Sequence, residues 1–147
     1  MAEIRTAAFV DLDPLTLYRL LRLRVDVFVV EQACAYPELD GRDTEPGTVH
    51  LWVERDQRPA AYLRIVREPD GTARVGRVVT AAEQRNDGLA AELVRHAIAL
   101  TAPAEVVLDA QSHLTGWYRR LGFVVDGAEF LDDGIAHTPM RLARPPC

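Results

Sequence analysis

Residues 85–90 read Arg-Asn-Asp-Gly-Leu-Ala and stand between an apolar run and an amphipathic segment. A helix that begins near Leu89 leaves its first backbone N–H groups unpaired and carries a partial positive charge at that end. Gly88 lets a ligand approach the backbone, and Asn86 tolerates a left-handed conformation better than most residues. This junction is therefore suited to binding an anion such as phosphate. A plain turn is the alternative, because such residues also open helices for local reasons.

A second group, residues 117–123, reads Trp-Tyr-Arg-Arg-Leu-Gly-Phe. The sequence contains neither G-x-G-x-x-G nor G-K-[ST], which argues against dinucleotides and nucleoside triphosphates as the anion. Arg85–Ala90 instead resembles the Q/R-x-x-G-x-G/A motif of the GNAT superfamily of acyl-CoA-dependent N-acyltransferases. Residues 117–123 resemble the aromatic-Tyr-x-x-Leu-Gly-Phe signature of the same superfamily.

Within that superfamily the chain most resembles the ElaA-like branch, over residues 15 to 142. The segments that carry this closer resemblance are Val27–Gln32, Cys34, Tyr36, Leu39–Gly41, Gly76–Val78, Ala110–Gln111, His113–Leu114 and Asp133–Ile135. The resemblance implies a GNAT-like fold and acetyl-CoA as the co-substrate. It leaves the oligomeric state open, with a homodimer as one outcome. The irregular spacing of the Glu, Asp and His residues argues against a metal site.

The resemblance also implies a division of labour among the residues. The pyrophosphate of CoA would lie on the backbone of Arg85, Asn86, Asp87, Gly88, Leu89 and Ala90, with Arg85 as a charged clamp. Asn86 departs from the family pattern, in which glycine is common there. Val78, Val79 and Thr80 would bind the pantetheine arm and the thioester carbonyl through their backbone, and Gln111 is also assigned to cofactor binding. Tyr118 would protonate the leaving CoA thiolate.

The implied reaction moves an acetyl group directly to a primary amine in a ternary complex, which requires a base for the amine proton. Many family members carry a Glu on the strand before the phosphate loop, whereas residues 74–79 contain no carboxylate. We expect His113 to serve, since it follows the strand end that should lie near the thioester. The other candidates are Glu31, His50, Asp109, His137 and a chain of water molecules. Cys34 as a covalent nucleophile is the rival scheme, but no His or Asp is committed to activating it.

The segment 31–47 is the candidate acceptor region, because it is long for a plain connection. It carries five acids, at positions 31, 38, 40, 43 and 45. These carboxylates would favour a cationic acceptor such as a polyamine, an amino sugar or a peptide amine. The alternative is a solvated loop, as for Arg19, Arg22 and Arg24, which we interpret as a solvated helix face.

The elements that position these groups follow from apolar spacing and turn signals. Asp13 and Pro14 open a helix that extends to about Val30. Strands are expected at 4–9, 48–55, 60–68, 72–79, 105–110, 123–125 and 135–142, with further helices over 89–102 and 112–121. The connection between strands 74–80 and 105–110 should be a right-handed parallel crossover. The fold class is therefore α/β with a mixed, mostly antiparallel sheet and helices on both faces.

Composition limits the classes of partner. The 147 residues are 48% hydrophobic and 27% charged, and we expect one domain over 1–147. A net charge of −5 argues against nucleic acid, whose binding depends on Lys and Arg. No apolar run of about 18 residues indicates a membrane span, and the N-terminus does not resemble a secretion signal. Two cysteines, Cys34 and the terminal Cys147, predict no structural disulfide, and we expect a cytoplasmic protein.

Two other functional classes stay open. The missing strand carboxylate allows a non-catalytic acyl-CoA-binding module that acts as a sensor or partner domain. Tyr118 counts against that reading, since a pure binder has no need of an acid. The third class is a structural domain that binds an anion without any role for CoA.

Overall fold

An eight-stranded mixed sheet forms the centre of the protein in a computed structural model, which describes residues 3–144. Cys147 lies outside the described residues. The strands lie in the order β1-β2-β3-β4-β5-β8-β6, and β7 also pairs with β8. Their bounds are β1 Ile4–Ala8, β2 Val49–Arg55, β3 Arg58–Arg67, β4 Ala73–Thr80, β5 Val106–Gln111, β6 Val124–Val125, β7 Phe130–Asp132 and β8 Ile135–Leu142.

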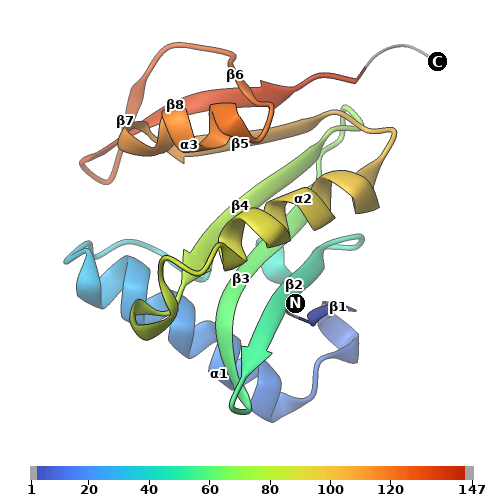
Figure 1. Cartoon of the computed structure of the whole chain (residues 1–147), viewed down its shortest axis with the longest axis vertical. Coiled ribbons are helices and arrows are strands. Elements are labelled where there is room, and N and C mark those ends of the chain that lie inside the picture. The colour runs from blue at the N-terminus through green and yellow to red at the C-terminus, as the bar shows by residue number, and fades with distance from the viewer. Residues whose placement is uncertain (1–2, 145–147) are drawn as a thin grey trace.

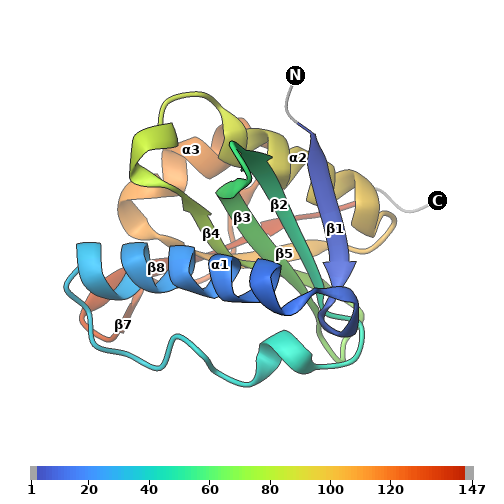
Figure 2. The same cartoon turned by 90° about the horizontal axis from the view of Figure 1, so that it is seen from below.

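Helices cover both faces of this sheet, which confirms the predicted layering. The α-helices are α1 Pro14–Arg24, α2 Leu89–Thr101 and α3 Thr115–Arg120. Figure 2 shows α1 on one face and α2 and α3 on the other. Short 3₁₀ turns cover Phe9–Asp11, Arg42–Thr44, Ala82–Gln84 and Ser112–Leu114.

The first helix begins as the sequence predicts. The Asp13 side chain accepts a hydrogen bond from the Thr16 N–H at 2.9 Å, and Pro14 occupies the first turn. The α-helix ends at Arg24, earlier than expected, but the chain stays helical as a π-helix over Val25–Glu31. Such wider turns are rare and occur often at functional sites, because they change which side chains share a face.

Two apolar clusters hold the layers together, one on each face of the sheet. On the α2 side, Leu51, Leu63, Leu93 and Phe123 belong to the larger cluster. On the α1 side, Leu20, Leu23, Trp52, Tyr62 and Val79 belong to the smaller one. Strand residues alternate between these clusters, as the period of two requires. Both faces of the central strands are therefore packed, and the sheet is a rigid support for the site.

The parallel pair β4–β5 is confirmed, and it opens along most of its length. Its only paired residues are Ala73 with Val106 and Arg74 with Val107, after which the two strands diverge (Figure 1). In the same part of β4, a bulge sets two residues, Arg77 and Val78, against one residue of β3. Arg77 has φ of 55°, an unusual value for a residue with a side chain. The bulge and the divergence together open the sheet between β4 and β5.

Two predictions about the C-terminal part were wrong in detail. The segment predicted as one helix over 112–121 is a 3₁₀ turn followed by α3, and the Ser112 hydroxyl bonds to Thr138 at 2.8 Å. The strand β7 was missed, since it is only three residues long and exposed. Asp133-Gly134, both with positive φ, form the hairpin turn to β8, and that dipeptide was the available signal.

Candidate functional site

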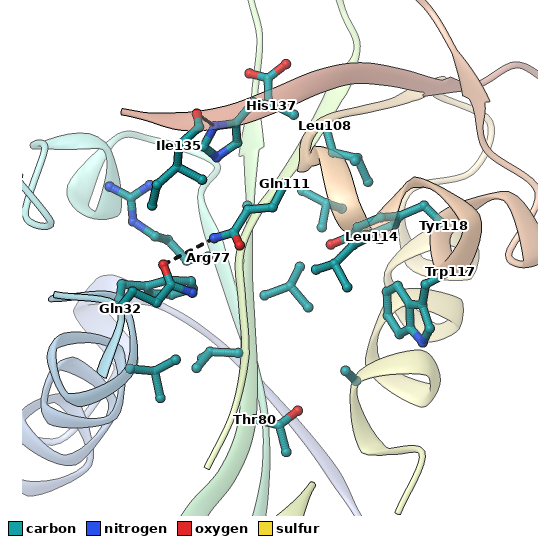
Figure 3. Close-up of a pocket in the computed structure, with 18 of the residues that line it drawn as sticks. Gln32, Arg77, Thr80, Leu108, Gln111, Leu114, Trp117, Tyr118, Ile135 and His137 are labelled. Atoms are coloured by element: carbon teal, nitrogen blue, oxygen red, sulfur yellow. Dashed lines mark hydrogen bonds between the residues drawn. The ribbon is translucent and has the colours of Figure 1, made fainter. Parts of the chain in front are cut away.

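A cavity of about 700 Å³ occupies the opening between β4 and β5. This volume lies within the usual range for small-molecule sites. Every site residue predicted from the sequence lines it, namely Val78, Val79, Thr80, Arg85, Asn86, Asp87, Gly88, Leu89, Ala90, Gln111, His113 and Tyr118. Figure 3 shows Tyr118 and Trp117 on one side of this cavity and Arg77 and His137 on another. The fold thus brings together residues that are far apart in the sequence.

The N-terminus of α2 opens onto this cavity without a side-chain cap. Gly88 occupies the N-cap position with φ of 75°, and no side chain accepts a hydrogen bond from the first turn. Asn86 also has a positive φ, of 72°. The unpaired N–H groups of the first turn and the helix dipole together favour an anion there.

Both charged side chains of the loop are already paired. Arg85 donates two hydrogen bonds to Glu31, of 2.7 and 2.9 Å, and a third to the Thr80 carbonyl at 3.3 Å. Asp87 accepts a hydrogen bond of 2.6 Å from Arg55. The carboxylate of Asp87 therefore faces a positive charge, which reduces its repulsion of a bound phosphate. The guanidinium of Arg85, expected as a clamp, is committed to Glu31 in this conformation.

Tyr118 is held in place by aromatic packing. Its ring meets Trp117 at 4.8 Å and Phe123 at 5.9 Å between centroids, both edge to face. Only 6% of the residue is exposed, and burial raises the pKa of its hydroxyl well above the usual value. Within residues 3–144 the hydroxyl makes no hydrogen bond. Tyr118 therefore presents a protonated and unengaged hydroxyl to the cavity at neutral pH.

Two of the histidines line the cavity, and they differ in how they are held. His113 is exposed on the 3₁₀ turn after β5. His137 lies on β8 directly opposite Gln111, and its Nδ1 stands 2.8 Å from the Ile135 carbonyl oxygen. Because a carbonyl only accepts, Nδ1 carries the hydrogen. Nε2 is therefore the ring nitrogen of His137 that can accept a proton.

The remaining candidates for the base already form hydrogen bonds or ion pairs with other residues. His50 is 2% exposed, and its two ring nitrogens contact the Tyr62 hydroxyl at 2.7 Å and the Asp43 carbonyl at 3.2 Å. It is a core histidine, and it lies outside the cavity. Asp109 pairs with Arg74 at 3.3 Å. Glu31, as noted, is paired with an arginine too.

Comparison with known proteins places these features in a family. The Acetyltransferase (GNAT) domain matches residues 22–144. The chain belongs to this GNAT family. A GNAT-like solved structure, an acyl-CoA N-acyltransferase from Pseudomonas aeruginosa, has a TM-score of 0.90 and 39% identity, covering 97% of this chain and 100% of that one. This likeness confirms the predicted fold.

The ElaA-like branch of the GNAT family is confirmed as well. Escherichia coli ElaA is 33% identical over 130 residues, which is 84% of this chain and 85% of that protein. Its crystal structure has a TM-score of 0.89 and covers 99% of this chain and 100% of that one. A UPF0039 protein of Mycobacterium tuberculosis is 48% identical over 134 residues, 88% of this chain and 86% of its own.

In this GNAT domain the acidic segment 31–47 does not form a free anionic surface, which corrects the sequence interpretation. Glu38 and Asp43 are 5% and 6% exposed and bind Arg24 at 2.6 and 2.7 Å. Arg24 is 1% exposed, so its assignment to a solvated face was also wrong. Asp40 pairs with Arg64 at 2.6 Å. The acids instead fasten the segment to α1 and the sheet.

Sequence reasoning missed a contact that crosses the opening of the GNAT sheet. The Gln111 amide donates a hydrogen bond of 3.3 Å to the Gln32 side chain, which links β5 to the end of the π-helix (Figure 3). Near it, the Cys34 thiol lies 3.6 Å from the Asp133 carbonyl. Gln32 was visible only as part of the ElaA-like resemblance, because nothing in its spacing marks a partner 79 positions away.

Two kinds of feature are absent from residues 3–144. No helix there has the length and apolar character needed to cross a bilayer. No group of three or more His, Cys, Asp or Glu side chains is arranged to hold a metal ion.

Proposed function

We propose that this GNAT domain transfers an acetyl group from acetyl-CoA to a primary amine by direct attack within a ternary complex. The observation that carries the proposal is the divergence of β4 from β5, with the uncapped start of α2 and the free hydroxyl of Tyr118 lining the same cavity. Such an opening suits a strand-like pantetheine arm that lies along the edge of β4.

Each part of the cavity has a task in this scheme. The backbone of Arg85–Ala90 binds the pyrophosphate, and the backbone of Val78–Thr80 binds the pantetheine arm and polarises the thioester carbonyl. The amine nitrogen attacks the carbonyl carbon, a C–N bond forms, and the C–S bond breaks. The proton of Tyr118 goes to the departing thiolate, and a base takes the proton that the amine loses. No covalent enzyme intermediate and no metal are needed.

The base is one of two histidines. His113 was expected from its position after β5, and it lines the cavity. His137 has the stronger geometric support, because the Ile135 carbonyl fixes its tautomer and leaves Nε2 free to accept a proton. The phenyl ring of Phe130, stacked on His137 at 5.8 Å, holds the imidazole from the other side.

The alternative function is a non-catalytic acyl-CoA-binding module. It predicts binding of acetyl-CoA without release of CoA to any amine. The unengaged hydroxyl of Tyr118 favours catalysis, because a binding module gains nothing from a phenol hydroxyl that faces the cavity without a hydrogen-bond partner. A cytoplasmic location and a homodimer remain predictions.

The test begins with isothermal titration of acetyl-CoA and, separately, of pantetheine without phosphate. We expect tight binding of acetyl-CoA and weak binding of pantetheine, because the pyrophosphate contacts carry much of the affinity. A screen of primary amines for acetyl-dependent release of CoA follows. Binding without release for every amine would favour the alternative module, and binding of neither ligand would contradict both functions.

A further inference from the structure

Two guanidinium groups line the part of the cavity that lies on the α1 side, and Glu31, which also lines that side, is paired with Arg85. Arg64 of β3 and Arg77 of β4 both face the cavity, whereas Glu38, Asp40 and Asp43, which neutralise them, do not line it. The cluster is thus ordered, with its positive groups toward the cavity and its negative groups behind. A ligand in this part of the cavity meets hydrogen-bond donors before it meets acceptors.

Arg64 keeps one buried donor without a partner. Its Nη atoms bind Asp40 at 2.9 and 2.6 Å and Asp43 at 3.2 Å. Its Nε is the one buried side-chain polar atom in residues 3–144 for which no hydrogen bond is found. An unsatisfied buried donor costs about 1–3 kcal/mol, so its persistence calls for an acceptor that arrives from outside the chain.

Gly76 leaves space beside this donor. It stands directly opposite Arg64 in the β3–β4 ladder, and a Cβ built on it would lie 3.9 Å from Nε of Arg64. Its φ does not fall in the left-handed region, so the backbone does not require glycine there. Glycine therefore keeps a side chain away from the unpaired N–H at this position.

Arg77 offers further donors close by. Arg64 and Arg77 share one oxygen of Asp40, at 2.6 and 3.4 Å, which brings the two guanidinium groups together. Arg77 uses Nε and Nη2 to bind Glu38, and its Nη1 has no hydrogen-bond partner within residues 3–144. A planar anion with two oxygens matches donors on two adjacent guanidinium groups.

We propose that Arg64 and Arg77, with the space at Gly76, bind the carboxylate of the acceptor, so that the substrate class is a small aminocarboxylate. This inference rests on the proposed function, because it names the acceptor of that same site. Asp132 and Asp133 also line the cavity, and neither forms an ion pair within residues 3–144, so their carboxylates suit the ammonium end of such a molecule. A zwitterion offers a carboxylate to the two arginines and an ammonium group to the two aspartates, whereas a polyamine offers the arginines no anion.

The experiment compares matched pairs of amines. Glycine, β-alanine and 4-aminobutyrate are each paired with the amine of equal chain length that lacks the carboxylate, and CoA release is measured with acetyl-CoA saturating. For at least one pair we expect kcat/KM to favour the aminocarboxylate by about tenfold or more, mainly through KM. Gly76→Ala should reduce that ratio about tenfold while the Kd for acetyl-CoA stays unchanged.

Gly116→Ala is the matched control variant. Its Cβ would also lie 3.9 Å from an arginine nitrogen, Nη1 of Arg120, and its φ is likewise not left-handed, but it does not line the cavity. This control should leave the carboxylate preference as it is in the unmodified protein. Equal rates for the members of every pair, or the same loss of preference in both variants, would overturn the inference.

A binding measurement separates the inference from the proposed function. The aminocarboxylates and their matched amines are titrated into the protein saturated with CoA, which cannot react. Carboxylate-dependent binding that Gly76→Ala abolishes, without turnover of any amine, would support the subsite and contradict the transferase. Turnover without a preference for the carboxylate would support the transferase and contradict the subsite. If no aminocarboxylate binds and none is turned over, the inference is overturned, and the partner of Arg64 Nε is then water.

Discussion

Arg85 and Glu31 are joined by two hydrogen bonds, of 2.7 and 2.9 Å, beside the loop that we propose as the pyrophosphate site. The pair links the end of the π-helix to the start of the loop before α2. It is exposed, so its contribution to stability is small, about 0–1 kcal/mol. Its larger effect is electrostatic, because Glu31 offsets the positive charge that would otherwise face a bound phosphate.

Replacing Glu31 with Gln should therefore tighten acetyl-CoA binding, by about two- to fivefold at low salt, with little change in the midpoint of thermal unfolding. Arg85→Gln should weaken binding, and its effect should fade as salt is added. Isothermal titration at two salt concentrations measures both. Weaker binding in Glu31→Gln would mean that Glu31 orients Arg85 toward the phosphate instead of competing with it.

Tyr118→Phe tests the proposed acid. Burial raises the pKa of this hydroxyl, so it stays protonated through neutral pH. Burial likewise makes a thiolate formed in the same cavity a stronger base, which can then take this proton. We expect kcat to fall by about 10²–10⁴-fold, since that is the usual contribution of a general acid. The Kd for acetyl-CoA should change less than about twofold. A parallel loss of both quantities would contradict the role.

Two substitutions of Gly88 separate the effect of backbone strain on acetyl-CoA binding from the effect of charge. No atom lies within 4 Å of a Cβ placed there, but φ is +75°, so Gly88→Ala costs about 1–2 kcal/mol of conformational strain without a clash. Gly88→Asp adds a carboxylate beside the proposed phosphate. We expect Asp to weaken acetyl-CoA binding by about tenfold more than Ala does. Equal affinities for the two variants would place the pyrophosphate elsewhere.

The pH dependence of kcat/KM identifies the base. We expect His137→Asn to lower kcat/KM by about 10²-fold and to remove the acidic limb of the profile, which belongs to a group that must be deprotonated. His113→Asn is measured beside it. If the limb disappears in His113→Asn instead, the base is the residue first expected from the sequence. A limb that survives in both variants would point to a chain of water molecules.

The free energy of unfolding at acid pH depends on the ion pairs that Asp40 and Asp43 form with Arg64 and Arg24. Burial alone would raise the pKa of Asp40 and of Asp43, but hydrogen bonds and nearby arginine charges together outweigh it and hold both pKa values below their ordinary range. The largest of these opposing causes is the hydrogen bond from Arg64 for Asp40 and from Arg24 for Asp43. The unfolded chain then binds protons first, near pKa ~3.9. This stabilisation is therefore complete above about pH 5 and is lost as pH falls below about 4.

Urea unfolding across this range measures the loss. His50, whose pKa is lowered by burial, contributes a separate decline that begins near pH 6.5, so the cluster is judged from the slope below about pH 4. Asp40→Asn should flatten that slope. Asp43→Asn should cost about 3–5 kcal/mol at neutral pH, because it leaves buried guanidinium groups without a full partner. An unchanged acid slope in Asp40→Asn would contradict this account.

The sequence predicted the elements that local chemistry determines. The cap at Asp13, the helix after Gly88 and the crossover to β5 depend on neighbouring residues, and they are confirmed. The two GNAT motifs lie in continuous stretches, so the resemblance could place them in one cavity before any geometry was known. Their roles in binding and transfer stay proposals.

The errors concern charges whose partners are distant in sequence. Arg24 looked solvated because its partners, Glu38 and Asp43, lie 14 and 19 positions away, and the acids looked free for the same reason. The alternation of apolar and polar residues does not predict a buried ion pair, because each member alone resembles a surface residue. For that reason the interpretation of the acceptor changed once the pairs were known.

The divergence of β4 and β5 also affects how readily the folded protein aggregates. Past Arg74 and Val107 the facing edges of these strands lack a partner strand in their ladder. Exposed edges of this kind recruit strands from other chains, which is a common first step of aggregation. In the proposed complex, the pantetheine arm would lie along this edge and cover it. The supply of CoA would then govern how long the folded chain persists as well as how fast it turns over.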